Sequence, residues 1–335
     1  MAGKRGWIDV HYHAMNAPYE KALTAIGGII RTPRWSRQEA LDFSERQDIG
    51  TGMLSLGIPG AHFGDDIKAR DLATRCNDDL ADFVALHPKR FGLFAMTSMP
   101  DIDGACAEAA RALDTLNADG IVLLSSYEGQ YLGQPQWDPL LEVLNQRSAV
   151  CFIHPNNHTT TAEVRKGFNA GIGNFLGEFM FDTTRAGMNL LFNNCLDRYP
   201  NIKFILAHAG GTLPYFSWRL GEIMERQMIN DPWDKQYRSP FMDAYAGKVT
   251  KELVLSKIQR FYFDTALSAG PQSLGSLLQV ADHDKILFGS DWPYCPEIMA
   301  TDMIAELAKN PLLDKKLKRA IARDNALKLF PRLAG

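Results

Sequence analysis

Two histidines near the start of the chain are spaced so that both could bind one metal ion. They lie in the segment Asp9-Val10-His11-Tyr12-His13, which has the composition of a strand. Because successive side chains of a strand point to opposite faces, His11 and His13 share one face and Tyr12 points away. Two imidazoles on one face are pre-spaced for a single ion, although the pattern also fits a strand with two ordinary polar residues.

Three further residues that can bind a metal or transfer a proton end other apolar runs. His154 ends the run in VCFIHP, His208 ends KFILAHAGG, and Asp291 ends ILFGSDWP. Any one of them, taken alone, is more often a half-buried polar side chain with a hydrogen-bond partner. Their repeated occurrence at strand ends indicates a shared site, since the carboxyl ends of barrel strands meet on one face.

The apolar runs themselves predict the fold. Eight of them alternate with stretches of helical periodicity, which is the pattern of parallel βαβ units. No glycine-rich phosphate turn of the kind that an open nucleotide-binding sheet requires is present. We therefore expect residues 1–335 to form one (β/α)8 barrel of the TIM type. The predicted strands are Trp7–Val10, Gly52–Leu56, Phe91–Met96, Gly120–Leu124, Ala149–Ile153, Lys203–Ala207, Arg260–Phe263 and Lys285–Phe288.

Helices and long loops are expected between these strands. The first loop, Ala14–Arg37, contains Gly27-Gly28 and Pro33 and shows little sign of regular structure. A second excursion, Met228–Thr250, belongs to the connection after the sixth strand. Loops after barrel strands lie over the active-site face. The predicted helices are Ala105–Leu116, Pro139–Gln146 behind Asp138 as N-cap, Leu190–Tyr199, Gln272–Val280 and Leu313–Leu329.

Charge and composition exclude several classes of protein. The net charge of −3 and the sequence pI of about 6.2 give little support for nucleic-acid binding. No window reaches the ~18 apolar residues of a membrane span, and the first residues lack the apolar core of a signal peptide. The five cysteines are odd in number and form no CxxC pair, which predicts reduced thiols in a cytoplasmic protein.

Three neutral imidazoles and one carboxylate are a ligand set that suits Zn²⁺ and also tolerates Mn²⁺, Fe²⁺ or Co²⁺. An open coordination position would remain for water or substrate. Two-metal sites of this kind use a lysine at the end of the fourth strand, and GIVLLSSYEG has none. Glu128 lies beyond that strand end, so we expect one divalent ion, Zn²⁺ by preference with Mn²⁺ as the alternative.

The remaining histidines serve as internal controls for this assignment. His62, His87, His158 and His283 lie in predicted loops or at helix ends, and none is assigned to the metal. His87 is expected at a helix C-terminus, where a positive charge suits the helix dipole. His158 follows His154 by only four residues and could line the pocket.

With these residues the chain resembles the amidohydrolase superfamily. The hallmark of that superfamily is an HxH motif on the first strand, histidines on the fifth and sixth strands, and an aspartate on the eighth strand. It is most similar to the aminocarboxymuconate-semialdehyde decarboxylase branch, and within it to the 6-methylsalicylate decarboxylase group. The resemblance covers nearly the whole chain. The segments that carry it are LLSSYEGQYLGQPQWDPLLEVLNQR, FIHP, EFMFDTTRAGMNLLF, FILAHAGGTLPYFSWRLGE, RFYFDTAL, ILFGSDWPY and ARDNALKLF.

The resemblance implies a non-oxidative decarboxylase of a small aromatic acid, such as a salicylate or 6-methylsalicylate. It assigns the metal to four residues and places His208 beside the open position as a proton-handling residue. It also matches Arg219 to an arginine that reaches into the neighbouring subunit's site and pairs with a substrate carboxylate, which implies a homodimer. The alternative for Arg219 is an exposed helix residue paired with Glu222 or Glu225. The metal ligands implied are His11, His13, His154 and Asp291.

Aromatic side chains near the predicted strand ends could form the walls of the substrate pocket. We consider Tyr127, Phe181 and Trp292 in this role, because an aromatic substrate favours aromatic faces. A residue of this kind is, however, more often an ordinary core residue than a pocket wall.

Decarboxylation would need a proton at the ring carbon that bears the carboxylate. We expect Asp291 to donate it and His208 to stabilise the charge on the substrate oxygen. Hydrolysis of a lactone, C–C or amide bond on the same metal is the first alternative. The second is a non-catalytic barrel with a structural zinc, against which an open, exposed site with a spare histidine argues. Removal of a structural zinc should unfold the protein, whereas removal of a catalytic ion should leave it folded and inactive.

Overall fold

The computed structural model of the chain describes residues 6–27, 33–159, 166, 174–230 and 239–334. Its centre is a sheet of eight parallel strands in the order of the chain, and the bridges Asp9–Phe288 and Tyr12–Trp292 join the last strand to the first. A strand occurs at each predicted run, so the barrel prediction is confirmed. The strands are β1 (Trp7–His13), β2 (Ile49–Ser55), β3 (Phe91–Ala95), β4 (Gly120–Leu124), β7 (Val150–His154), β8 (Lys203–Leu206), β9 (Tyr262–Asp264) and β10 (Ile286–Leu287).

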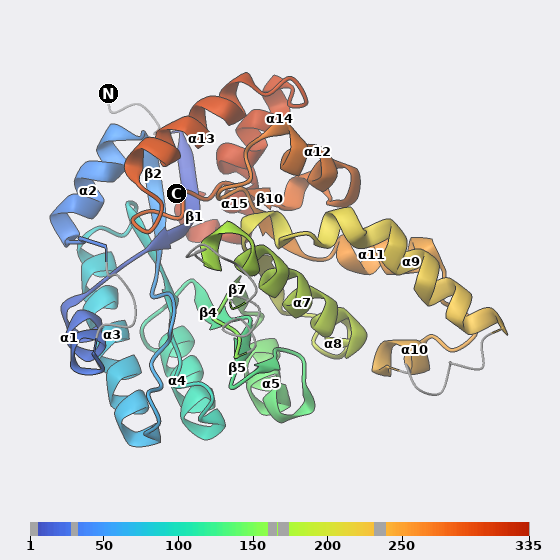
Figure 1. Cartoon of the computed structure of the whole chain (residues 1–335). Helices are drawn as coiled ribbons and strands as arrows, with labels where there is room; N and C mark the ends of the chain where they lie inside the picture. Colours follow the sequence, from blue (N-terminus) through green and yellow to red (C-terminus); the bar gives the residue numbers. More distant parts are fainter. Residues whose placement is uncertain (1–5, 28–32, 160–165, 167–173, 231–238, 335) are drawn as a thin grey trace.

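Helices surround this barrel, and a short hairpin follows β4 (Figure 1). The helices are α1 (Ala17–Ala25), α2 (Arg37–Arg46), α3 (Asp66–Leu86), α4 (Ile102–Asp114), α5 (Asp138–Gln146), α7 (Glu178–Phe192), α8 (Cys195–Arg198), α9 (Leu213–Asn230), α10 (Pro240–Ala244), α11 (Lys251–Ile258), α12 (Pro271–Val280), α13 (Glu297–Lys309), α14 (Lys315–Arg319) and α15 (Asn325–Leu329). The hairpin strands are β5 (Ser126–Tyr127) and β6 (Gln130–Tyr131). Short 3-10 turns are Pro135–Trp137, Asn174–Leu176, His208–Gly210, His283–Lys285 and Pro331–Ala334, and Ala320–Asp324 is a π-helical turn between α14 and α15.

The strands are apolar runs because both of their faces are buried. The helices cover the outer face of the barrel, and large side chains fill its interior. Phe94 on β3 and Phe152 on β7 stack there with ring centroids 5.6 Å apart. Phe152 also lies edge-on beneath His11, with centroids 4.8 Å apart, and so forms an apolar floor under the end of the first strand.

Several helices begin where a polar side chain caps the first turn. In each, a side-chain oxygen accepts a hydrogen bond from the backbone N–H three residues later, which satisfies a donor that has no partner inside the helix. These capping residues are Ser36, Asp65, Asp101, Ser239, Thr250 and Asp314.

Three local predictions were wrong. The first loop contains helix α1, whose Tyr19 and Leu23 are buried against the barrel, so burial of an apolar face outweighs the weak local signal. The predicted helix Leu190–Tyr199 is broken between α7 and α8, where Asn194 adopts a left-handed conformation (φ 54°). Asp138 lies inside α5 and gives no side-chain cap, because the preceding 3-10 turn already leads into the helix.

The excursion after the sixth strand contains more helix than expected. Helix α9 extends outward from the barrel on the right of Figure 1, and α10 lies near its far end. Residues 28–32 of the first predicted loop and 231–238 of the second lie outside the described residues. Among the helices that the structure describes, none is long and apolar enough to cross a membrane. All five cysteines, each within the described residues, are free.

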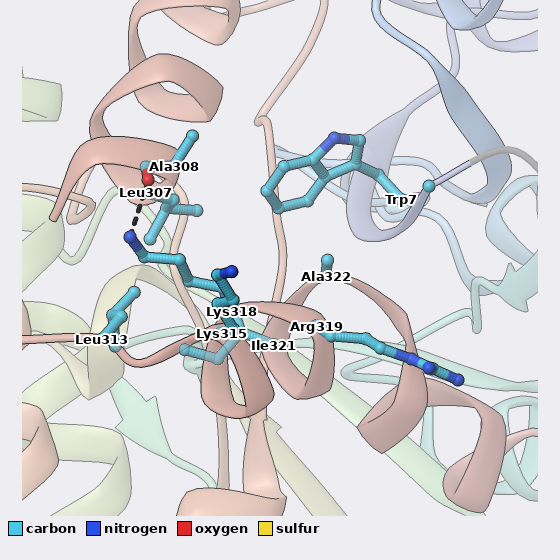
Figure 2. Close-up of a pocket in the computed structure, with 10 residues that line it drawn as sticks. Trp7, Leu307, Ala308, Leu313, Lys315, Lys318, Arg319, Ile321 and Ala322 are labelled. Carbon is cyan, nitrogen blue, oxygen red and sulfur yellow. Dashed lines mark hydrogen bonds between the residues drawn. The ribbon is translucent and has the colours of Figure 1, made fainter.

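A hollow of about 410 Å³ lies at the end of the barrel where the strands begin (Figure 2). Trp7, the first residue of β1, lines it together with Leu307 and Ile321, and basic side chains of Lys315 and Arg319 also reach it. The histidines of β1 lie toward the opposite end of that strand. This hollow is therefore separate from the residues expected to carry the chemistry.

The position of Tyr12 bears on the prediction that alternate side chains of β1 point to opposite faces of the strand. Its side chain is fully buried, and its hydroxyl donates to the Ala40 carbonyl oxygen over 2.7 Å on the outer side of the barrel. Tyr12→Phe should lower the free energy of unfolding by about 1–2 kcal/mol, because a buried hydrogen bond is lost. Metal affinity should not change. Urea unfolding and metal titration check both, and a fall in metal affinity at unchanged stability would contradict the assigned orientation.

Candidate metal centre

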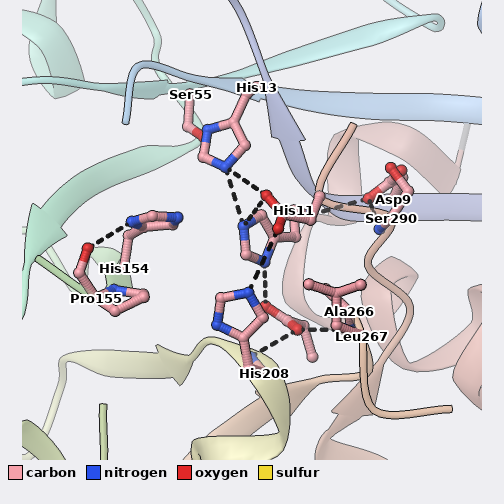
Figure 3. A network of polar contacts seen from close by, with 12 residues as sticks. Asp9, His11, His13, Ser55, His154, Pro155, His208, Ala266, Leu267 and Ser290 are labelled. Carbon is pink, nitrogen blue, oxygen red and sulfur yellow. Dashed lines mark hydrogen bonds and ion pairs between the residues drawn. The ribbon is translucent and has the colours of Figure 1, made fainter. Parts of the chain in front are cut away.

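The four residues predicted to bind a metal lie together at the carboxyl end of the barrel (Figure 3). One ligand atom from each of them can be chosen so that all four lie within 4.8 Å of one another. Nε2 of His11 lies 3.0 Å from Nε2 of His13. Oδ1 of Asp291 lies 3.2 Å from the former nitrogen and 3.0 Å from the latter. The predicted set is therefore brought together, and its role in binding stays a prediction.

The other nitrogen of each imidazole is held by the surrounding chain. Nδ1 of His11 lies 2.9 Å from Oδ2 of Asp264, and Nδ1 of His154 lies 2.7 Å from the carbonyl oxygen of Pro155. Both partners are acceptors, so these nitrogens carry a proton and Nε2 is the nitrogen left to bind a metal ion. Nδ1 of His13 has only the longer 3.4 Å contact with the Ser55 hydroxyl. Such partners orient metal-binding histidines and select their tautomer.

Backbone contacts fix where β1 meets β10. Asp9 accepts hydrogen bonds at Oδ1 from the backbone N–H groups of His11 and Ser290, each over 3.0 Å. A Cβ atom on Gly289 would lie 2.7 Å from Cβ of His11, so only glycine allows this approach. The first and last strands therefore deliver His11 and Asp291 to the same point.

The buried charges of the cluster act strongly on one another. Burial alone would disfavour a charged His11, but the charges of Asp264 and Asp291 outweigh it and raise the pKa of His11 to about 10. Burial opposes ionisation of Asp291 too, yet the charge of His11 and hydrogen bonds from three histidines hold the Asp291 pKa well below its usual range. Burial lowers the pKa of His13 and His154. The two carboxylates therefore favour positive charge at His11, while burial favours the neutral forms of His13 and His154.

A divalent cation fits this donor set. The three closest ligand atoms are 3.0–3.2 Å apart. Each of them can only accept a hydrogen bond, unless one of the imidazole nitrogens carries a proton. Ligands bonded to a tetrahedral zinc at about 2.0–2.1 Å lie roughly 3.3 Å apart, which matches this spacing. Glu128, the possible second-metal ligand considered above, is exposed in the hairpin turn and does not belong to the cluster.

His208 and Asp291 face each other at the edge of the cluster. Nε2 of His208 lies 3.6 Å from Oδ2 of Asp291, the carboxylate oxygen that points away from His11 and His13. Both residues have left-handed backbone conformations, with φ of 55° and 59°, which are uncommon for side chains other than glycine. The expectation of an exposed site was wrong: His208 is 3% exposed and the Asp291 side chain 12%.

Asp264 is a candidate functional residue that the sequence analysis missed. It ends β9 and is fully buried. Its Oδ1 accepts from the backbone N–H groups of His208 (3.0 Å) and Ala266 (2.9 Å), while Oδ2 holds His11. One carboxylate thus positions a predicted ligand and the predicted proton-handling residue. The signal was available, because Asp264 ends a strand as the predicted ligands do.

Two predicted pocket residues lie in the core. The Tyr127 hydroxyl accepts a hydrogen bond from the backbone N–H of Leu124, and its ring packs against Trp137. Trp292 stacks on Phe43 with centroids 4.5 Å apart, toward the outer helix α2. Both contacts are typical of packing, and the predicted contact of Tyr127 and Trp292 with substrate remains untested.

The other two lie on the surface. Phe181 on α7 is 43% exposed, and Arg219 on α9 is exposed. Glu222 pairs with Arg226 and Lys251, and Glu225 accepts the backbone N–H of Lys251, so neither alternative ion pair of Arg219 is seen among the described residues. The predicted contact of Arg219 with a substrate therefore stays a prediction.

Two other aromatic residues stand closer to the histidines. Tyr294 packs edge-on against His13 with centroids 5.0 Å apart, and its buried hydroxyl has no hydrogen-bond partner within the described structure. Phe179 on α7 lies 6.3 Å from His154. Neither was singled out from the sequence, because an aromatic residue next to a motif carries no signal of its orientation.

The histidines used as controls lie outside the cluster. His62 contacts Asp66, His87 caps the C-terminus of α3 as predicted, and His283 contacts the Leu278 carbonyl oxygen. His158 stacks on Tyr131 with an interplanar angle of 8°.

Known proteins resemble the chain over almost its full length. The family model described as amidohydrolase matches residues 8–332. The 6-methylsalicylic acid decarboxylase of Penicillium expansum is 34% identical over 337 residues, covering 98% of this chain and 97% of that protein. A crystal structure described as an amidohydrolase II has a TM-score of 0.84 at 29% identity, covering 97% of this chain and 99% of the other. The dihydroxybenzoic acid decarboxylase of Polaromonas sp. JS666, solved with manganese and 2-nitroresorcinol, has a TM-score of 0.79 at 23% identity, covering 98% and 97%, and shares the fold.

Asp264 provides a direct test of how the cluster is held. In Asp264→Asn an amide N–H₂ can face Nδ1 of His11 and favour the tautomer with its proton on Nε2, which cannot bind a metal. Metal affinity should fall about 10–100-fold. The matched control is Ser55→Ala, since the 3.4 Å contact to His13 is long and its loss should matter less. Equal effects of the two variants in a chelator-competition titration would contradict this account.

Proposed function

Because this chain belongs to the amidohydrolase family, we propose that it is a metal-dependent, non-oxidative decarboxylase of a small aromatic acid. The substrate is a hydroxybenzoate of the salicylate or 6-methylsalicylate type, and CO₂ is released. The 34% identity to a 6-methylsalicylic acid decarboxylase over nearly the full length of both chains supports this choice. A carbon–carbon lyase of this kind needs no redox cofactor, because no oxidation takes place.

One observation carries the proposal: Asp291 presents its two carboxylate oxygens to different partners. Oδ1 lies among the histidines that would hold the ion, at 3.0 Å from Nε2 of His13. Oδ2 faces His208 at 3.6 Å. The same carboxylate can therefore bind a cation through one oxygen and exchange a proton through the other.

The cofactor in this proposal is one divalent ion held by His11, His13, His154 and Asp291. It would supply positive charge that neutralises and orients the carboxylate and phenolate oxygens of the substrate. Zn²⁺ is the expected ion, because imidazole nitrogens at tetrahedral spacing suit it. Mn²⁺, which the Polaromonas decarboxylase structure contains, is the alternative.

The chain's own residues move the proton. Because the pKa of Asp291 is held well below its usual range, its carboxylate must first receive a proton. The phenol of an ortho-hydroxybenzoate could supply it if the positive charge of the ion lowered the pKa of that phenol. Asp291 then protonates the ring carbon that bears the carboxylate, while His208 stabilises the charge on the neighbouring oxygen. The C–C bond breaks, its electron pair restores the aromatic ring, and CO₂ leaves. Near-complete burial of both residues keeps bulk water away from this step.

The exposed side of α9 supports a homodimer in which Arg219 completes the neighbouring site. Arg219 lies among Tyr215, Trp218 and Ile223, which are 77%, 70% and 41% exposed. Large apolar side chains gathered on one helix mark an interaction surface, and α9 packs beside α7, which carries the exposed Phe181. In the dimer, Arg219 pairs with the carboxylate of a substrate bound by the partner copy.

We propose that residues 1–335 belong to one barrel domain, since the family match covers residues 8–332. The five free cysteines support a cytoplasmic location, where thiols stay reduced.

The activity is tested with metal-loaded enzyme and a panel of hydroxybenzoates that includes 6-methylsalicylate and, as the matched control, para-hydroxybenzoate. CO₂ should be released only where a hydroxyl is ortho to the carboxylate. His208→Ala and Asp291→Ala should lose about 10²–10⁴-fold in rate, the usual worth of proton transfer by a positioned group. Metal content measured in parallel separates loss of the proton path from loss of the ion. Hydrolysis of lactones without any CO₂ release would assign the site to a hydrolase instead.

Subunit complementation tests the role of Arg219. Arg219→Ala and His208→Ala chains should each be nearly inactive alone. After unfolding and refolding together, up to about a quarter of wild-type activity should return, because half of randomly paired dimers are mixed and each has one intact site. No recovery in a mixture that has formed dimers would show that Arg219 does not act across the interface.

A further inference from the structure

A second buried carboxylate, outside the four proposed ligands, contacts the peptide that orients His154. Asp182 lies in the second turn of α7 and is 2% exposed. Its Oδ2 accepts a 2.7 Å hydrogen bond from the backbone N–H of Asn156. The peptide that contains this N–H also contains the carbonyl of Pro155, and that carbonyl oxygen accepts the Nδ1 proton of His154 over 2.7 Å.

These contacts form a continuous path from a carboxylate to a proposed metal ligand. The negative charge of Asp182 on the N–H side polarises the peptide and makes its carbonyl a better acceptor. A better acceptor keeps the proton of His154 on Nδ1 and its lone pair on Nε2, toward the cluster. Asp264 does the same for His11 by direct contact. We propose that Asp182 is a positioning residue for the metal centre, acting on His154 through the Pro155–Asn156 peptide.

The surroundings of Asp182 show that its carboxylate is fixed in place. The hydroxyl of Ser125, directly after β4, donates to Oδ2, and the hydroxyl of Tyr131 donates to Oδ1 over 2.8 Å. Three donors from two loops thus hold one carboxylate, which is the arrangement expected for an ionised acceptor. Phe179, one turn earlier on the same face of α7, lies against His154. Helix α7 therefore contacts this histidine both through the peptide and directly.

The inference rests on the proposed function only in taking His154 as a metal ligand. Substrate and reaction do not enter it, so it can be tested on metal binding alone. Zn²⁺ affinity, measured by competition with a chelating dye, should fall about 10–100-fold in Asp182→Asn, the usual effect of losing an outer partner of a ligand. His154→Ala should show an equal or larger loss.

Asp119→Asn is the matched control. Asp119 lies directly before β4, whereas Ser125 lies directly after it. Like Asp182, Asp119 accepts a hydrogen bond from a backbone N–H group, that of Leu93, over 2.9 Å. Its substitution should lower the unfolding temperature without changing Zn²⁺ affinity. An equal fall in affinity in both variants would show a general structural effect and overturn the proposal. Unchanged affinity in Asp182→Asn beside a clear loss in His154→Ala would overturn this inference alone. Unchanged affinity in His154→Ala would overturn it together with the proposed ligand set.

A measurement on the wild-type chain keeps the proposal testable if Asp182→Asn fails to fold. In metal-free enzyme labelled with ¹⁵N-histidine, the His154 signal, identified by its loss in His154→Gln, should be that of the Nδ1–H tautomer. The amide proton of Asn156 should be shifted downfield and exchange slowly with solvent, as expected for a charge-assisted hydrogen bond. A proton on Nε2 of His154, or a rapidly exchanging Asn156 amide, would overturn the proposal.

Discussion

The need for positive charge among buried acceptor atoms is the constraint on which the rest of this structure depends. Imidazole nitrogens and a carboxylate oxygen converge to 3.0–3.2 Å at the end of the barrel, where all of these side chains are nearly or fully buried. The high pKa of His11, about 10, expresses the same demand, since a proton takes the place that a cation would fill. Strand order, the glycine beside His11 and the hydrogen bonds at Nδ1 all serve to hold these atoms in that arrangement.

Holding the cluster has a cost in stability that the surrounding barrel must offset. Asp9 and Asp264 are fully buried, and burial raises the pKa of Asp9 to about 7 despite its hydrogen bonds to Ser290. His208 and Asp291 adopt left-handed backbone conformations, each of which costs about 1–3 kcal/mol. Sites of this kind persist where the scaffold is rigid, and the aromatic layer beneath them, Phe94 and Phe152, provides such a base.

The sequence predicted the parts of this protein that follow from period and position. Strand runs ending in His154, His208 and Asp291 placed those side chains on one face, because parallel strands in a barrel end together. No such rule tells how a side chain in a loop or on an outer surface is oriented. The sequence therefore could not predict that Tyr127 packs in the core or that Trp292 stacks toward the outer helix. The sequence also did not predict the helix break at Asn194, because a left-handed residue other than glycine does not change the local hydrophobic pattern.

Anomalous diffraction at the absorption edge of the bound metal tests the central claim most directly. The account predicts one peak for each chain, at about 2.0–2.2 Å from Nε2 of His11, His13 and His154 and from a carboxylate oxygen of Asp291. Oδ2 of Asp291 should stay on the side of His208. Two peaks in the barrel, a peak away from these four residues, or a fully loaded crystal without a peak here would contradict it.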